Sequence, residues 1–243
     1  MPSTSQNYQV WDKDHGWSQD GDEWHDQAEF CRQPYDSWKR ALFEEFMSPY
    51  LTSASHVLEI GPGHGRWSKL YVESVEHVSL VDLSPSCIEH CKRLFFALDH
   101  VDYFVNDGTS LPFIGKQTVD FIWSYDVFVH IERQEFKRYL RECARVLKNG
   151  GVAVIHHKNA EHSLRFLAKV FLVNLTGPLR NKMADYVFRR YGNMGRSFIS
   201  SRMVSRMARG SGLQPVRQTA TWGPNHEFNC LKWNDEISVL RKA

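Results

Sequence analysis

The sequence predicts an α/β fold in which a doubly wound, mainly parallel sheet is covered by helices on both faces. Two observations lead to this prediction. Short apolar runs alternate with amphipathic stretches between residues 36 and 158, and the first run leads into a glycine-rich turn, VLEIGPGHG at residues 57–65. Such alternation is typical of parallel strands joined by right-handed crossover helices, and a glycine-rich turn brings backbone N–H groups close to a ligand.

Apolar periodicity assigns the individual elements. Residues 34–51 space Trp38, Leu42 and Phe46 four apart, which indicates an amphipathic helix. Ser84 and Pro85 are expected to start another helix, because serine at the N-cap and proline in the first turn favour helix initiation. Helices are predicted at residues 34–51, 66–74, 84–98, 134–148 and 199–212, and strands at residues 56–60, 77–83, 101–108, 118–126, 150–159, 213–222 and 228–240.

The composition indicates one globular, intracellular domain. The chain has 243 residues, a hydrophobic content of 42% and eight Trp, enough for one large core. No run approaches the ~18 apolar residues of a membrane span, and the start, MPSTSQNYQVWDKDHG, has no signal peptide. The five Cys form no CxxC pair, which argues for a reducing compartment and against a disulfide scaffold or a zinc site. The expected location is therefore cytoplasmic.

Two segments differ from the rest of the chain. Residues 1–35 are acidic and contain several Trp, which is unusual for a disordered tail and predicts a strap or lid. Residues 36–243 are expected to form the main domain, with a basic, aromatic, helical cap inserted at residues 160–199. The net charge of the chain is only +2, but its basic residues are concentrated in this segment. The segment is therefore either a solvated face or a cap for an anionic substrate, carrier or membrane surface.

Acidic residues end three of the predicted strands. Glu59, Asp82 and Asp107 stand at the carboxyl ends of the first three strands, the edge at which doubly wound sheets bind ligands. Asp82 is placed to accept hydrogen bonds from a ribose diol. Three carboxylates repel a pyrophosphate, and Arg66 occupies the position at which a dinucleotide fingerprint needs glycine. The ligand is therefore expected to carry hydroxyls or a positive charge.

These motifs resemble those of the class I S-adenosylmethionine-dependent methyltransferases. VLEIGPGHG, VSLVDLS, VNDGTSLPF and VDFIWSYDVFVHI are similar to the family's first four motifs, and LRECARVLKNGGVAVI to the helix and strand that follow. The resemblance implies a Rossmann-like sheet of about seven strands whose last strand is antiparallel. It also implies S-adenosyl-L-methionine as the cofactor, a sulfonium cation with a ribose diol and no phosphate, and S-adenosyl-L-homocysteine as the product.

The resemblance further implies roles for the cofactor-binding residues. The glycines of the first motif would lie under the methionine and ribose, and Asp82 would hold the ribose diol. Asp107 and the Gly108 amide would read adenine, while Ser124 and Tyr125 would line the pocket near the sulfonium. The implied cofactor-binding set is Glu59, Gly61, Gly63, Gly65, Asp82, Leu83, Asp107, Gly108, Ser124 and Tyr125.

The stretch after the fourth strand bears on the acceptor atom. It reads SYDVFVH and lacks the Pro-Pro pair that usually serves methylation of a base or amide nitrogen, so a hydroxyl acceptor is favoured. A hydroxyl needs a general base, and histidine is the usual base near neutral pH. His130 follows the fourth strand, while His156 and His157 end the fifth, where side chains alternate between the two faces. We favour His157 and His130 as the base, with Asp126 as the alternative.

The predicted function is therefore O-methylation. IHHKN and DVFVHIE are similar to stretches of sugar and surface-glycan methyltransferases, so the predicted acceptor is a hydroxyl of a sugar or glycan. A phenolic, lipid or other small natural product is the alternative, and a nucleic-acid enzyme or binding module is less favoured. Asp126, His157 and Asn159 carry groups able to hold Mg²⁺, but the sequence does not support a metal and none is assigned.

Overall fold

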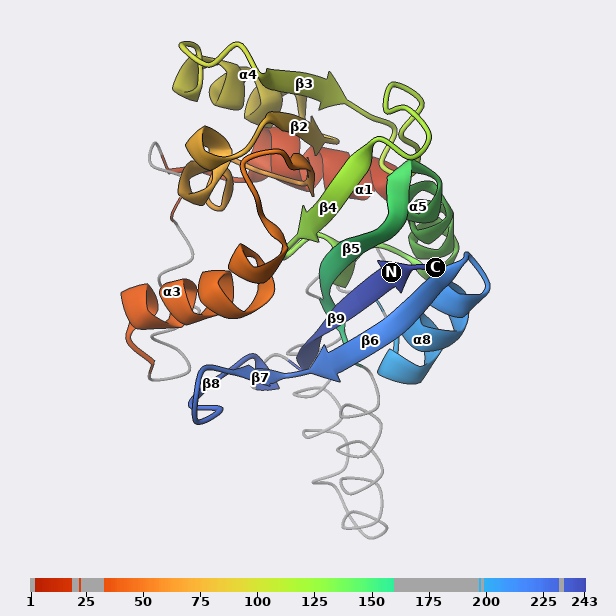
Figure 1. The fold of residues 1–243 in the computed structure, drawn as a ribbon. Coiled ribbons are helices and arrows are strands. Elements are labelled where there is room, and N and C mark those ends of the chain that lie inside the picture. The colour runs from red at the N-terminus through yellow and green to blue at the C-terminus, as the bar shows by residue number, and fades with distance from the viewer. Residues whose placement is uncertain (1–2, 19–21, 23–32, 160–196, 198, 232–233) are drawn as a thin grey trace, which may run out of the picture.

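A central sheet organises the chain. The computed structural model describes residues 3–18, 22, 33–159, 197, 199–231 and 234–243. The strands of the sheet are β1 (His56–Ile60), β2 (His77–Asp82), β3 (Val101–Val105), β4 (Val119–Ser124), β5 (Leu147–Lys158), β6 (Leu213–Thr219) and β9 (Asp235–Lys242). They form a seven-stranded sheet in the order β3-β2-β1-β4-β5-β9-β6 (Figure 1). β9 runs antiparallel to both of its neighbours, and the other pairs are parallel, which confirms the predicted sheet.

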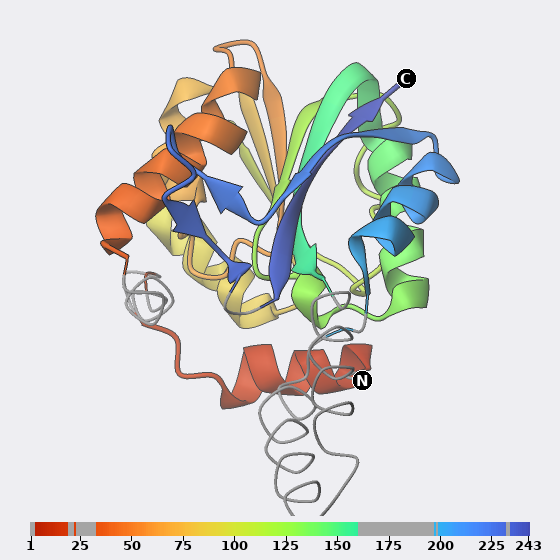
Figure 2. The same cartoon turned by 90° about the horizontal axis from the view of Figure 1, so that it is seen from below.

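Helices cover both faces of this sheet. They are α3 (Tyr35–Phe46), α4 (Pro85–Leu94), α5 (Arg133–Val146) and α8 (Ser201–Arg209). Figure 2 shows α3 and α4 on one side of the sheet and α5 and α8 on the other. Alternate strand residues such as Val154 belong to the core under α3, and the intervening ones such as Ile155 to the core under α5 and α8. Burial of both faces explains why the strands read as almost continuous apolar runs.

The helix ends follow the capping residues of the sequence. Ser84 Oγ accepts a hydrogen bond from Cys87 N at 3.2 Å, and Pro85 is the first residue of α4. Ser200 caps α8 in the same way, and α8 ends at Gly210. The predicted start of α4 at Ser84 and Pro85 and the glycine end of α8 are therefore confirmed. α4 ends at Leu94, four residues before the predicted end, and α8 is shorter than predicted at both ends.

The helix predicted at residues 66–74 is wrong. The structure has two 3₁₀ turns in this segment, Ser68–Leu70 and Val72–Ser74. Ser68 Oγ and Tyr71 OH both donate to the Glu59 carboxylate, at 2.6 and 2.7 Å. Both side chains are thus directed at Glu59, a tertiary contact that the periodicity of the sequence does not reveal.

Each of the last two predicted strands is divided. The additional short strands are β7 (Thr221–Trp222) and β8 (Phe228–Asn229), which pair with each other. Trp222 is buried in the core under α3, and its indole Nε1 donates to Trp38 O at 3.2 Å. The small second sheet therefore fastens α3 to the main domain.

The chain begins with a helical segment beside the carboxyl ends of the strands. α1 (Thr4–Tyr8) starts at Ser3, whose hydroxyl accepts from Gln6 N, and continues into a wider π-helical turn, Gln9–Asp14. Figure 2 shows this segment crossing below the sheet. The cap predicted at residues 160–199 lies outside the described residues, apart from Ser197 and Ile199.

Candidate active site

A cavity of about 450 Å³ opens at the carboxyl ends of β1, β2 and β4. The strand order reverses between β1 and β4, and doubly wound sheets bind ligands at this point. The first residues of the chain close the other side of the cavity. Its lining includes Gly61, Gly63, Asp82, Leu83, Gly108, Tyr125, Asp126 and His130.

Gly61 shows why the turn after β1 needs glycine. Its φ of +75° lies in the left-handed region, and a Cβ atom there would be 2.1 Å from Val127 Cγ2. Gly61 N also donates to Val81 O at 2.7 Å, which holds the turn against β2. Backbone atoms rather than side chains therefore form this wall of the cavity.

Asp82 ends β2 and lines the cavity. Its Oδ2 accepts from Gly63 N at 3.2 Å, and its Oδ1 accepts from Ser84 N at 2.9 Å. Burial raises the pKa of Asp82 to about 6, although the backbone hydrogen bonds favour the charged form. The glycine turn and the start of α4 thus fix the carboxylate at the edge where a ligand diol is expected.

Two of the implied cofactor-binding residues lie beneath the cavity rather than in its lining. Glu59 is buried, and burial raises its pKa to about 7 while Ser68 and Tyr71 donate to it. Ser124 is buried as well, and its Oγ donates to Ile60 O at 2.8 Å. Both side chains therefore brace the ends of β1 and β4 in this structure.

Gly65 and Asp107 also lie outside the lining. A Cβ atom on Gly65 would be 2.8 Å from Leu94 Cδ2, so this glycine packs against α4. Asp107 is exposed. Its Oδ1 accepts from Thr109 N at 2.8 Å and from Ser110 N at 2.7 Å, and these bonds hold its carboxylate within the turn that follows β3. Of the pair expected to read adenine, the structure places Gly108 at the cavity and not the Asp107 carboxylate.

The N-terminal segment is anchored across the cavity. Asn7 Nδ2 donates to His130 O at 2.9 Å. At the other end of the segment, Ser84 Oγ donates to Asp12 Oδ1 at 2.7 Å, at the start of α4 where the helix dipole favours a carboxylate. Trp17 lies between these elements and lines the cavity. The segment expected as a strap is thus held at both sides of the opening.

Asp126 follows β4 and lines the cavity in a strained conformation. Its φ of +62° is rare for a residue other than glycine, and such strain tends to occur at functional sites. Asp126 N donates to His156 Nδ1 at 3.2 Å, and its Oδ2 lies 3.5 Å from Arg66 Nη1. These contacts hold the carboxylate at the cavity wall.

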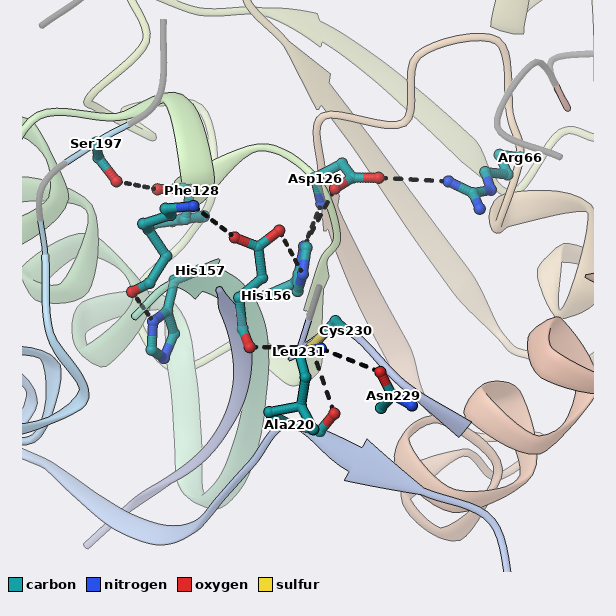
Figure 3. A network of polar contacts seen from close by, with 12 residues as sticks. Arg66, Asp126, Phe128, His156, His157, Ser197, Ala220, Asn229, Cys230 and Leu231 are labelled. Atoms are coloured by element: carbon teal, nitrogen blue, oxygen red, sulfur yellow. Dashed lines mark hydrogen bonds and ion pairs between the residues drawn. The ribbon is translucent and has the colours of Figure 1, made fainter. Parts of the chain in front are cut away.

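Buried polar and ionisable groups continue from Asp126 into the core (Figure 3). His156 Nδ1 is 3.3 Å from Asp126 Oδ1, and His156 Nε2 is 3.6 Å from Asp235 Oδ2. Lys158 Nζ is 3.6 Å from Asp235 Oδ1, and the His156 ring stacks on Tyr125 with 4.1 Å between centroids. Because isolated buried charges are costly, the Asp235 carboxylate beside Lys158 makes the burial of this ammonium tolerable.

The structure separates the candidate histidines. His130 lines the cavity, and its ring centroid is 5.0 Å from that of Trp11. His157 is fully buried on the face of β5 opposite to His156, and its Nε2 is 2.6 Å from Ser238 Oγ. Burial lowers the pKa of His157 to about 4. The structure therefore brings His130 to the cavity but not His157, and His156 also lies outside the lining.

Sequence reasoning missed the contributions of Arg66 and Asp235. Arg66 entered only as a departure from a dinucleotide fingerprint, yet it is buried and lines the cavity. Asp235 begins β9 and is buried against the end of β5. The available signals were an arginine directly after a glycine turn and the acidic pair Asp235-Glu236 before the run ISVL, neither of which is specific.

Comparisons with known proteins agree with this fold. Residues 57–151 match the family model described as "Methyltransferase domain". A Mycobacterium tuberculosis protein named "Probable S-adenosylmethionine-dependent methyltransferase" is 28% identical over 107 residues, which cover 44% of this chain and 37% of that protein. The chain therefore spans well under half the length of the curated relatives it matches.

Solved structures show the same fold over nearly the whole chain. The geranyl diphosphate C-methyltransferase of Streptomyces coelicolor, solved with S-adenosylhomocysteine, aligns with 100% of this chain and 99% of its own at 14% identity and a TM-score of 0.64. A TehB-like methyltransferase of Corynebacterium glutamicum aligns with 86% of this chain and 96% of its own, at 16% identity and a TM-score of 0.56.

Residues 57–151 therefore match a methyltransferase domain, and the fold is the one found in solved methyltransferase structures. S-adenosylmethionine is the cofactor named for the curated relatives, and the cavity can be compared with it. The cavity fits this cofactor. Its described lining combines the carboxylates of Asp82, Asp126, Glu132 and Glu135 with one Arg or Lys, Arg66. S-adenosylmethionine carries a sulfonium, an ammonium, a ribose diol and one carboxylate, which matches an acidic lining with a single strong cation.

Among the described residues, no helix has the length and apolar character needed to cross a membrane. The same part of the chain contains no group of three or more His, Cys, Asp or Glu side chains arranged to hold a metal ion.

Proposed function

We propose that the protein transfers the methyl group of S-adenosylmethionine to a hydroxyl of a sugar or glycan. The observation that carries this proposal is that Asp126 and His130, both after β4, face the same cavity as Asp82 and the glycine turn. The cavity thereby contains groups able to take a proton from a hydroxyl. Trp11 and Trp17 in the lining support a sugar, whose C–H faces pack on flat aromatic rings.

The residues of the chain would divide the work as follows. When bound, the cofactor supplies an electrophilic methyl group on its sulfonium. Asp82 would hold the ribose diol, and the turn at Gly61 would lie against the methionine. Tyr125 would shape the cavity near the reacting atoms. His130 would take the acceptor proton on a ring nitrogen, and exact positioning of the acceptor would supply much of the acceleration.

The two flanking segments also have proposed roles. The N-terminal segment would act as a lid, because Asn7 and Asp12 tie it to opposite sides of the cavity and a closed lid excludes water. The cap at residues 160–199 would select the acceptor. This second role concerns residues outside the described part of the chain and is proposed from the sequence alone.

A small-molecule natural product is the second candidate acceptor. Val127 and Ile131 add apolar surface to the lining next to His130, which suits a phenolic or lipid acceptor. The fold neighbour from Streptomyces coelicolor, a geranyl diphosphate C-methyltransferase, also acts on a small molecule according to its name.

A mass-spectrometric screen tests the proposed function. The full chain is incubated with S-adenosylmethionine and with matched panels of neutral sugars, uronic acids, phenols and isoprenoid alcohols. We expect a methylated sugar together with S-adenosylhomocysteine. Methylated phenols or isoprenoids in place of sugars would favour the second candidate. Tight binding of S-adenosylhomocysteine without any methylated hydroxyl would contradict O-methylation.

Replacement of Asp82 should weaken cofactor binding. We expect Asp82→Ala to lower the affinity for S-adenosylmethionine by at least ~1.5 kcal/mol, the scale of a hydrogen bond to a charged group. Because the pKa of Asp82 is about 6, its carboxylate is charged above that pH and neutral below it. Wild-type affinity should therefore fall as the pH is lowered from about 8 to about 5, and Asp82→Ala should lose this dependence.

Calorimetry at several pH values measures both effects. Asp102→Ala is the matched control, since Asp102 is an exposed acid on β3 that lies outside the cavity. Unchanged affinity in Asp82→Ala, or tight NAD binding by the wild type, would contradict the assignment.

A further inference from the structure

Arg66 is the one Arg or Lys among the described residues that line the cavity. Its side chain is only 6% exposed. The guanidinium carbon lies 5.0 Å from the Trp67 ring, 5.6 Å from the Trp38 ring and 5.7 Å from the Tyr125 ring. Aromatic faces favour a cation, but a charge that is always present and so deeply buried also needs anionic partners.

The contacts of Arg66 satisfy only part of its guanidinium. Nε donates to Tyr35 OH at 3.2 Å, and Nη1 lies 3.5 Å from Asp126 Oδ2 (Figure 3). Nη2 is buried and has no hydrogen-bond partner among the described residues. Buried donors are nearly always paired in native proteins, so an unpartnered one on a residue of the cavity lining points to an acceptor that a bound ligand supplies.

The surroundings of Arg66 already accommodate a carboxylate. The Asp22 carboxylate accepts from Lys39 Nζ at 2.8 Å and from Tyr35 OH, and lies 3.6 Å from Arg66 Nε. Burial opposes the charge on Asp22, but Lys39 and Tyr35 keep its pKa below the usual value. The side of the guanidinium turned to Asp22 is therefore an environment that stabilises a carboxylate.

We propose that Arg66 is the anion-binding residue of the cavity and takes the carboxylate of a bound ligand. This inference rests on the proposed function, which brings to the cavity a cofactor with a methionine carboxylate and an acceptor that carries one if it is a uronic acid. A planar guanidinium offers N–H groups that match a carboxylate. The other charged lining residues, such as Glu132 and Glu135, repel an anion, so Arg66 fixes which end of the ligand lies beside Tyr125.

Paired ligands that differ by one carboxylate test the proposal. Calorimetry compares S-adenosylhomocysteine with decarboxylated S-adenosylhomocysteine, and tryptophan fluorescence compares glucuronate with glucose on the protein saturated with S-adenosylhomocysteine. For at least one pair, the wild type should prefer the carboxylated ligand by at least about tenfold. Arg66→Met should abolish that preference, measured as the ratio of the two affinities within each pair.

Two variants serve as controls. Arg66→Lys keeps the charge and should retain part of the preference. Lys39→Met removes a cation that also contacts Asp22 but does not line the cavity, and it should leave the preference within about threefold of wild type. Melting temperatures identify any variant that fails to fold, and the wild-type ligand comparison remains informative in that case.

The outcomes separate the sources of the carboxylate. If Arg66→Met loses the preference for S-adenosylhomocysteine over its decarboxylated form, Arg66 binds the carboxylate of the cofactor. If it loses the preference for glucuronate over glucose, Arg66 binds the carboxylate of the acceptor. Equal affinities within both pairs for the wild type, or a preference that persists in folded Arg66→Met, would overturn the proposal. If S-adenosylhomocysteine does not bind the wild type at all, the proposed function fails, and the inference built on it fails too.

Discussion

Asp235→Ala is expected to lower the free energy of unfolding by about 3–5 kcal/mol, the range for removing one partner of a buried ion pair. Asp235 is 1% exposed, and its carboxylate lies between His156 Nε2 and Lys158 Nζ, both at 3.6 Å. Without Asp235, the buried Lys158 ammonium would lose this carboxylate. Chemical denaturation of the variant and the wild type measures the difference.

A double-mutant cycle isolates the ionic part of this effect. Lys158→Met in the Asp235→Ala background should recover part of the lost stability, because it removes the buried ammonium that Asp235 faces. Asp102→Ala is the matched control. Asp102 pairs with His77 at 3.1 Å on the exposed edge of the sheet, and its loss should cost less than about 1 kcal/mol. A similar loss in both variants would contradict the importance of burial.

The sheet could be predicted from the sequence because both of its faces are buried. Val154 and Ile155 are apolar for two different cores, so residues 152–155 read as an uninterrupted apolar run. β1 and β4 are also mainly apolar, with Glu59 and Asp120 as the acidic exceptions. The error at residues 66–74 has a different origin. There a contact with Glu59, on another element, decides the local conformation, and periodicity carries no information about such a contact.

The site was predictable where the backbone determines it. Gly61 and Asp82 occur at fixed positions after their strands, and both line the cavity. Side-chain direction at the strand ends was harder to predict. Alternation predicted that His156 and His157 point to opposite faces of β5, but it did not predict which of them points toward Asp126 in the cavity lining. The structure answers this through tertiary contacts, since His156 meets Asp126 and His157 meets Ser238.

Placement therefore changes the expectation for the catalytic base. His157 is buried away from the cavity and neutral near pH 7, because its pKa is lowered to about 4. Its replacement should lower the stability of the fold, because it removes the contact with Ser238 and the packing against Phe136. The ring centroids of His157 and Phe136 are 6.1 Å apart. His130 remains the histidine at the cavity after β4, with Asp126 on the same segment.

His130→Ala is expected to lower kcat by about 10² to 10⁴, the range for losing a general base. The reason is that a hydroxyl is a poor nucleophile while it keeps its proton, and His130 is placed in the cavity to take that proton. Turnover is measured at saturating cofactor with the acceptor found in the screen. Affinity for S-adenosylhomocysteine should stay within about threefold of wild type, because this assignment gives His130 no cofactor contact.

His157→Ala is the matched comparison for His130→Ala. It should lower the melting temperature more than His130→Ala does, yet keep most of kcat in the folded fraction, because it empties a buried site without touching the cavity. Added imidazole should restore part of the activity of His130→Ala, which a purely structural role would not allow. If His130→Ala keeps more than about a tenth of wild-type kcat, a histidine base at this position is excluded and Asp126 becomes the better candidate, since its carboxylate faces the same cavity.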